Sequence, residues 1–278
     1  MNLHYLCIAW AGSLLVATPH RAAGSNPSDS DHPSVPTILQ RTVAQGKNDA
    51  GQGYLYEGAY TQSTVFEEFD GRGQIKKRSE KLYAVDFPSG IRRLTEAKIN
   101  GSPLSPSELK QEEDRETRNR RRFVQVEPGQ EKNGDEGMFT ADLAEKYHFT
   151  WVGRDTIDGR PMFVLDFEPK LDPPIRHPLD RLLNHLKGRV WIDAREYEIA
   201  RAEIHLQTEV NLWGGILASL QKFTFTVNRS RAAPAMWYVA AFAGDFDART
   251  LFGPLHVRVR SSSSNFHWLR PESADCDR

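Results

Sequence analysis

Hydrophobic and polar residues alternate along this chain with two different periods, and each period predicts one kind of element. Apolar residues at helical spacing predict helices over residues 36–45 and 179–187. A third helix is predicted over residues 106–123, because Ser105 and Glu108 form a capping box at its start. Between the helices, runs with a period of two predict about ten strands. These runs follow one another through short turns, so the predicted sheet is antiparallel.

The strand-like runs have one apolar face and one polar face. In the run Gln74–Phe87, Tyr83 and Val85 share one parity, while Lys76 and Arg78 share the other. Such half-buried strands need a second layer on their apolar face. The sequence therefore predicts an α+β fold in which helices lie on one face of a single large sheet. The sheet should be strongly curved, because a flat sheet of that size is unusual.

A short helix with an apolar stripe is predicted directly before one of the strands. Leu179, Leu182, Leu183 and Leu186 fall at i, i+3, i+4 and i+7, and Gly188 follows as a helix stop. Burial of four leucines would stabilise the packed helix by about 6–12 kcal/mol before entropy is subtracted. The helix can be interpreted as a lid over the apolar face or as a fixed part of the core, and the sequence leaves both open.

The connection after residue 212 is unusually apolar. Loops between strands are normally polar, yet Trp213, Ile216 and Leu217 surround two glycines here. Two interpretations remain open: the loop folds back over the core, or it forms an apolar rim that contacts a lipid or a partner.

The two ends of the chain differ from its middle. Residues 1–24 combine an apolar run with small residues behind it, which predicts a cleaved signal peptide and export. Residues 25–35 are rich in Ser, Asp and Pro and are predicted to be a disordered lead-in. Residues 36–270 are then predicted to form a single domain, and residues 271–278 a polar tail.

The composition of the chain mainly argues against certain classes of function. Lys and Arg number 36 against 37 Asp and Glu, which argues against binding of nucleic acid through bulk charge. The nine histidines show no metal-site spacing, and no cofactor or nucleophile motif is present. Asp193 is better explained as a turn residue at a strand end than as a general base. Cys7 and Cys276 fall in the predicted signal peptide and tail. We therefore predict a non-catalytic protein without metal, cofactor or internal disulfide.

Several segments resemble those of a known family. They are Ser89-Gly90-Ile91-Arg92-Arg93, residues 99–105 with the charged helix behind them, Asp158-Gly159-Arg160, and Gly188-Arg189-Val190-Trp191-Ile192-Asp193. Together with the order of elements, these segments resemble the periplasmic lipoprotein-carrier superfamily, the LolA/LolB/RseB-like fold. Within it, the chain looks most like an uncharacterised group of outer-membrane lipoprotein-sorting-like proteins. The resemblance implies an incomplete antiparallel β-barrel whose concave face is covered by helices and whose cavity holds acyl chains.

The resemblance implies an exported periplasmic carrier or sensor that binds lipid or lipoprotein acyl chains. The alternative is an RseB-like regulatory or scaffold module that binds a protein partner, which would be membrane-associated, without transporting lipid. The predicted ligand-binding residues are Leu179, Leu182, Leu183, Leu186, Trp191, Trp213, Ile216 and Leu217. The identity of the ligand, the partner and the oligomeric state do not follow from the sequence.

Overall fold

A computed structural model describes most of the chain. The described residues are 33–52, 58–86, 93–124, 141–171, 175, 180–212, 218–234, 236–250 and 253–268. The predicted signal peptide and the predicted polar tail lie outside these ranges. Among the described residues, no helix has both the length and the apolar character that a membrane span requires.

Two of the three predicted helices are confirmed, and one is wrong in extent. The helices are α2 (Val35–Gln52), α3 (Pro106–Val124), α4 (Ala141–Lys146) and α5 (Asp180–Leu183). α2 is longer than the predicted 36–45, and α3 matches 106–123 closely. α5 is a single turn instead of a helix over 179–187, and α4 was not predicted.

Twelve strands form one antiparallel sheet, where about ten were predicted. The strands are β1 (Gly58–Phe69), β2 (Ile75–Asp86), β3 (Arg93–Ile99), β4 (Ser102–Pro103), β5 (Tyr147–Ile157), β6 (Arg160–Pro169), β7 (Leu186–Asp193), β8 (Ile199–Leu206), β9 (Val210–Leu212), β10 (Ala218–Ala233), β11 (Met236–Thr250) and β12 (Gly253–Trp268). Their order is β4-β3-β2-β1-β12-β11-β10-β8-β7-β6-β5, with β9 paired to β10.

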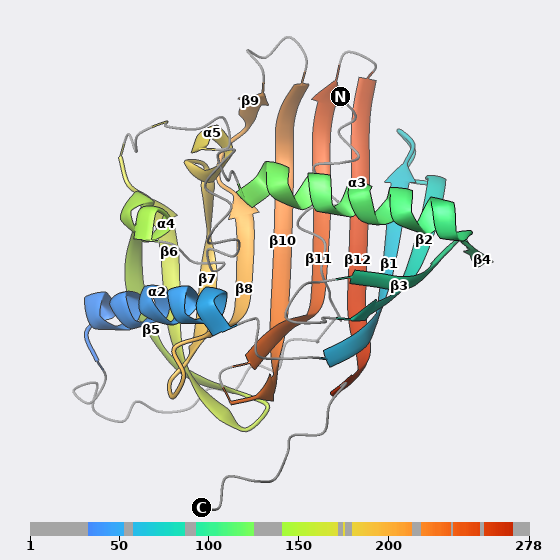
Figure 1. Cartoon of the computed structure of the whole chain (residues 1–278). Coiled ribbons are helices and arrows are strands. Elements are labelled where there is room, and N and C mark those ends of the chain that lie inside the picture. Colours follow the sequence, from blue (N-terminus) through green and yellow to red (C-terminus); the bar gives the residue numbers. More distant parts are fainter. Residues whose placement is uncertain are drawn as a thin grey trace, which may run out of the picture.

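The sheet does not close on itself within the described residues: β4 and β5 form its two edges. The N-terminal and C-terminal parts of the chain meet in its middle, where β1 pairs with β12. Figure 1 shows α2 and α3 lying across the strands on the same side of the sheet, with α3 in front of β10, β11 and β12.

Local turn chemistry explains the meander. Asp70 accepts hydrogen bonds at its carboxylate from the backbone N–H groups of Arg72 and Gln74, both at 2.9 Å, and so closes the β1–β2 turn. Asp158 and Gly159 have φ values of 50° and 72°, the left-handed conformation of a tight hairpin turn between β5 and β6. The predicted hairpin at this position is confirmed.

The start of α3 is also confirmed in detail. The Ser105 N–H donates to the Glu108 carboxylate at 2.9 Å, and the Glu108 N–H donates to the Ser105 hydroxyl at 3.4 Å. This reciprocal pair is the capping box that the sequence predicts. Hydrogen bonds from the Ser105 side chain and backbone lower the pKa of Glu108.

One face of the sheet carries the main core, and we call it the helix-facing side. Its largest cluster joins buried side chains from β1, β5–β8 and β10–β12, and apolar residues of α2, α4 and α5 pack against it. Ile38 of α2, which is fully buried, is the deepest of these helix residues. A smaller cluster around Tyr83 and Val85 of β2 contacts Leu109 of α3.

Candidate functional site

The predicted leucine stripe is realised by two elements instead of one helix. Leu182 lies in α5, but Leu186 is the first residue of β7 and pairs with Leu206. Both leucines are buried in the main cluster, and Leu183 is partly buried against it. Helical spacing was misleading here because a helical turn followed by a strand places the same leucines on one side. Leu179 lies outside the described residues.

Gly188 is not a helix stop but an interior residue of β7. A Cβ atom at this position would lie 1.9 Å from the carbonyl oxygen of Glu203 on β8. Only glycine permits this approach between the two strands, which explains why the motif Gly188–Asp193 begins with it.

α5 is tied to the core by buried polar contacts. The Lys146 ammonium at the end of α4 lies 3.2 Å from the Asp180 carboxylate at the start of α5, and both side chains are at least 96% buried. The Tyr147 hydroxyl donates to the backbone carbonyl of Leu183 at 2.6 Å. Burial, and secondarily the charge of Asp180, raises the pKa of Tyr147 well above its usual value. Removal of α5 from the sheet would therefore expose a desolvated ion pair and an apolar contact together.

A single row of cross-strand neighbours connects the helix-facing side from β5 to β2, and we call it the central row. In order it runs Trp151, Leu165, Val190, Ala202, Val227, Phe242, Ser261, Thr64 and Lys81. The first six side chains are apolar, the next two carry hydroxyls and the last is a cation. The row therefore changes from apolar to polar at β12.

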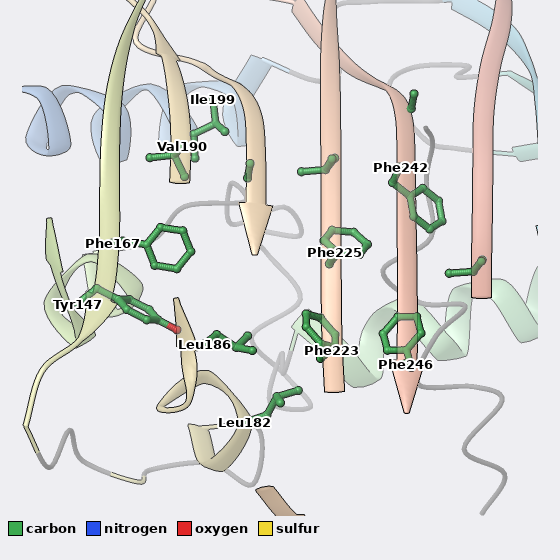
Figure 2. Close-up of a cluster of buried hydrophobic side chains, with 14 of the residues drawn as sticks. Tyr147, Phe167, Leu182, Leu186, Val190, Ile199, Phe223, Phe225, Phe242 and Phe246 are labelled. Carbon is green, nitrogen blue, oxygen red and sulfur yellow. The ribbon is translucent and has the colours of Figure 1, made fainter. Parts of the chain in front are cut away.

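Aromatic rings surround the apolar part of the central row. Figure 2 shows Phe223 and Phe225 on one strand and Phe242 and Phe246 on the next, with Tyr147 and Phe167 further along the sheet. Phe223 and Phe246 meet edge to face at 5.1 Å between ring centroids, and Phe225 and Phe242 lie 5.7 Å apart. These rings are buried and form a broad apolar layer within the main cluster.

α3 crosses this aromatic surface without an apolar stripe of its own. Residues 110–122 of the helix contain no apolar side chain. Among the described residues, the main cluster includes side chains of α2, α4 and α5 but none of α3. The described contacts of α3 with the sheet are at its first turns, where Leu109 packs near Tyr83 and Glu112 is buried. A polar helix thus crosses the apolar strands β10–β12, visible in Figure 1.

The polar end of the central row meets the first half of α3. Thr64 and Ser261 hydroxyls lie 2.7 Å apart, and both side chains are buried. Lys81 donates to the Glu112 carboxylate at 2.7 Å, and the Tyr83 hydroxyl and Arg115 also pair with Glu112. Sequence reasoning missed this group, because Lys81 and Thr64 become neighbours only through the register of β1 and β2.

Trp191 belongs to the opposite side of the sheet from the leucines. It packs in a separate cluster with Met162, Val164 and Ala200. Its indole N–H donates to Asp155 at 2.9 Å, and the guanidinium of Arg201 lies over its ring. In β7, Leu186, Val190 and Ile192 face the helices and Trp191 has the other parity, so the grouping of Trp191 with them in one cavity is wrong.

Ion pairs on the strand ends bring two of the motifs together. Arg160, of the motif Asp158–Arg160, donates to both oxygens of Asp193 at 2.6 and 2.9 Å. The Asp193 carboxylate also accepts from the backbone N–H groups of Arg195 and Glu196. Burial raises the pKa of Asp193, but these hydrogen bonds outweigh it and leave the pKa below its usual value. Asp193 is thus the turn residue that the sequence predicts, and it also forms an ion pair with Arg160 that was not predicted.

A second carboxylate completes this network. Glu196 accepts from Arg231 and from the Trp237 indole, both at 2.7 Å. Burial raises its pKa, but the bonds from Arg231 and Trp237 lower it further than burial raises it. Carboxylates held ionised in this way are poor general acids.

Two aspartates and a histidine come together on neighbouring strands. Asp245, Asp247 and His256 present ligand-type atoms within 4.8 Å of one another. His256 lies 3.4 Å from one carboxylate and 3.5 Å from the other. Arg258 and Lys222 both contact Asp245, so two cations already balance the two carboxylates. Sequence reasoning missed this cluster, because cross-strand register creates it.

Three further predicted residues, Trp213, Ile216 and Leu217, lie outside the described residues. Their role as an apolar rim stays a prediction. The neighbouring Leu220 is buried in the main cluster.

Comparison with known proteins gives a fold-level result. No protein-family model matches the chain, and no curated protein matches its sequence. The fold resembles that of solved LolA-superfamily structures, the superfamily indicated by the motifs. One match is an outer membrane lipoprotein-sorting protein domain from Vibrio parahaemolyticus, 13% identical, covering 85% of this chain and 94% of that chain, with a TM-score of 0.32.

Two other matches have similar values. A LolA superfamily protein from Nitrosomonas europaea is 12% identical, with coverage of 86% and 95% and a TM-score of 0.28. MucB from Pseudomonas aeruginosa, solved with MucA, is 11% identical, with coverage of 84% and 99% and a TM-score of 0.24. Because the identities and TM-scores are low, the function is inferred below from the contacts of this chain.

Proposed function

We propose that this protein is a non-catalytic carrier or sensor that binds the acyl chain of a lipid or lipoprotein. The chain would lie on the helix-facing side of the sheet, along the apolar part of the central row. In this proposal the sheet is curved, that side is concave, and the helices cover it.

The observation that carries the proposal is the mismatch between α3 and the strands beneath it. Phe242 and Phe246 of β11 and Val257 of β12 are buried members of the main cluster. The helix that crosses these strands offers thirteen successive polar residues, 110–122. A polar helix gains little by contact with such a surface, whereas an acyl chain gains about 0.8 kcal/mol for each CH₂ group that it buries.

The dimensions fit one acyl chain. Adjacent strands lie about 4.7–4.9 Å apart, so the apolar part of the central row, from β5 to β11, spans about 24 Å. A bilayer hydrocarbon core of about 30 Å is made of two acyl chains end to end, so one chain needs about 15 Å. The row from β11 to β6, about 19 Å, is long enough.

The contacts of α5 favour the fixed interpretation over the lid. The buried pair Lys146–Asp180 and the bond from Tyr147 to Leu183 hold this turn on the sheet. We therefore place the ligand beneath α3 and treat α5 as core, with Leu182 and Leu186 forming one wall of the site.

Mass spectrometry of lipids extracted from the purified protein tests the proposal. Protein exported by a bacterial host should carry an acyl-containing lipid in near-equimolar amount. After delipidation, isothermal titration calorimetry should show saturable binding of laurate. A lipid-free protein that binds no laurate would overturn the proposal and favour the protein-binding alternative.

A variant separates the two interpretations of α5. Leu183→Asp places a carboxylate in an apolar contact and should lower stability. If α5 is fixed core, the folded variant binds laurate as the wild type does. A loss of laurate affinity in the folded variant would instead identify α5 as part of a gate.

The proposed location is the periplasm. It is supported by the apolar run and small residues within positions 1–24. Sequencing of the mature N-terminus should find a start near residue 25, and an intact Met1 on cytoplasmic protein would contradict export.

A further inference from the structure

The cluster of Asp245, Asp247 and His256 lies on the side of the sheet that faces away from the helices. Phe246 and Val257, which are next to these residues in sequence, belong to the main cluster on the helix-facing side. Successive side chains of a strand point to opposite faces. We propose that Asp245, Asp247 and His256 bind one Zn²⁺ ion, with one ligand atom from each residue. This site is separate from the proposed acyl site and does not depend on it.

The register of two strands brings the three residues together. Asp245 and Asp247 of β11 are two residues apart and so share a face. His256 of β12 is the direct cross-strand partner of Asp247. One ligand-type atom from each of the three residues lies within 4.8 Å of the others. One imidazole and two carboxylates suit Zn²⁺ better than Mg²⁺ or Ca²⁺, which prefer oxygen ligands alone.

The distances within the cluster match those between ligands that share an ion. The Nε2 atom of His256 lies 3.4 Å from a carboxylate oxygen of Asp245, and its Nδ1 atom lies 3.5 Å from one of Asp247. Both distances are longer than an N–H···O hydrogen bond, which is about 2.7–3.2 Å. Two tetrahedral ligands of Zn²⁺, each about 2.0–2.2 Å from the ion, lie about 3.3–3.5 Å apart. A shared ion therefore explains these distances better than direct hydrogen bonds do.

His256 gives a second, independent indication of a ligand. Its Nε2 atom is buried and has no hydrogen-bond partner among the described residues. The side chain as a whole is 34% exposed, so an ion can reach the ring from solvent. The ring also packs on Phe69, with 4.7 Å between the ring centroids, and this contact fixes its orientation. A buried polar atom without a partner costs free energy, which coordination of an ion would recover.

Two cations near Asp245 show how the ion would enter. Arg258 donates to Oδ2 of Asp245 at 3.1 Å and leaves Oδ1 facing the histidine. Lys222 approaches the same Oδ1 only at 3.5 Å, and its side chain is 56% exposed. A bound Zn²⁺ would displace Lys222 into solvent, which costs little because exposed ion pairs are weak. Lys222 therefore competes with the ion, and its removal should tighten Zn²⁺ binding.

Isothermal titration calorimetry of the full-length mature protein, stripped of metal with EDTA, tests the site. Zn²⁺ should bind saturably at one ion per chain, whereas Mg²⁺ and Ca²⁺ should give no saturable signal at the same concentrations. Asp247→Asn and His256→Ala should each weaken Zn²⁺ binding by about a hundredfold or more, since loss of an outer partner of a metal ligand alone costs about 10–100-fold. Lys222→Met should tighten Zn²⁺ binding by up to about fivefold.

His205→Ala is the matched control for loss of a histidine. His205 is exposed on β8 and lies in one cross-strand row with Asp245 through Thr224, so it is on the same side of the sheet but outside the cluster. Its removal should leave the Zn²⁺ affinity unchanged.

Three results would overturn the proposal. They are the absence of saturable Zn²⁺ binding, wild-type affinity in both Asp247→Asn and His256→Ala, and equal binding of Mg²⁺ and Zn²⁺. Circular dichroism confirms that each variant is folded before titration. Because the Asp247 side chain is 36% exposed, Asp247→Asn keeps the test decisive even if His256→Ala does not fold.

Discussion

Two halves of the same sheet face are covered in different ways. Over β5–β8, the helices α2 and α5 supply apolar side chains such as Ile38 and Leu182, and the pair Lys146–Asp180 joins α4 to α5. Over β10–β12, the crossing helix is α3, and its residues 110–122 are polar throughout. In the first half, the strands pack against apolar side chains of the protein's own helices. The second half has buried apolar side chains on its strands beneath a crossing helix whose residues 110–122 are polar, and this is where we propose that the ligand binds.

The difference shows how one fold can combine stability with binding. A cluster that is packed against its own helices gains its stability without a ligand. A surface left for a ligand must stay apolar and yet be covered by an element that can release it. A helix rich in charges is suited to this role, because its polar side chains are solvated whether the site is filled or empty.

The largest loss of stability is expected from a substitution in the buried pair Lys146–Asp180. Asp180→Ala leaves the Lys146 ammonium buried without its carboxylate and should lower the free energy of unfolding by about 3–5 kcal/mol. Urea unfolding followed by circular dichroism measures it. The double variant Lys146→Met/Asp180→Leu should recover most of that loss, and equal losses in both variants would show that the pair is not what fixes α5.

Substitution of one glycine in each half of the sheet compares how the two halves respond to an added methyl group. Gly188→Ala would place a Cβ atom against the backbone of Glu203, so β7 and β8 must separate, at about 1–3 kcal/mol or more. At Gly244 of β11 the added Cβ would meet the ring of Phe246 at 2.5 Å, and a ring can rotate aside. We expect Gly244→Ala to cost less stability but to weaken laurate binding, because the ring would move into the proposed site.

Thermal unfolding with and without laurate measures both consequences. Gly188→Ala should lower Tm and keep the rise that saturating laurate produces, whereas Gly244→Ala should lose most of that rise. Gly71→Ala is the control, since nothing lies within 4 Å of its added Cβ. An unchanged laurate response in Gly244→Ala would contradict a ligand site on β11.

Acid should weaken the ion pairs of Asp193 and Glu196 at the strand ends and so lower the stability of the protein. The pKa values of Asp193 and Glu196 are lowered in the folded state from ordinary values of 3.8 and 4.5. Their contribution to stability is therefore present above those values and is lost as pH falls through the lower folded-state values. The urea midpoint should drop on acidification below about pH 4. Glu196→Gln should flatten this dependence, and an identical profile in the variant would refute the assignment.

The smallest effect is expected at the start of α3. Ser105→Ala removes the capping box and should cost about 0.5–2 kcal/mol. Because none of the described side chains of α3 belongs to the main cluster, urea unfolding should stay a single transition with an unchanged slope. Ser107→Ala in the same turn is the control for loss of a hydroxyl.

The sequence predicted what local chemistry determines. The capping box at Ser105 and Glu108 and the turn at Asp158-Gly159 were both visible, because each depends on residues within one turn of the chain. The same holds for Asp193, whose turn partners lie two and three residues away.

What the sequence could not supply was register. Leu186 fits a helix by spacing, and only its pairing with Leu206 makes it a strand residue. Trp191 was grouped with the leucines although a strand places alternate residues on opposite faces. Lys81 has the parity of Tyr83 and Val85, and its position in the central row depends on its pairing with Thr64, seventeen residues away.

The most direct test of the central claim is the location of a bound acyl chain. A laurate analogue with a terminal diazirine is bound to the delipidated protein and photoactivated, and labelled peptides are identified by mass spectrometry. Labelling should concentrate on β10 and β11, within Phe223–Val227 and Phe242–Phe246, and excess laurate should suppress it. Labelling confined to the opposite side of the sheet, around Trp191 and Met162, or labelling that laurate does not suppress, would contradict the account.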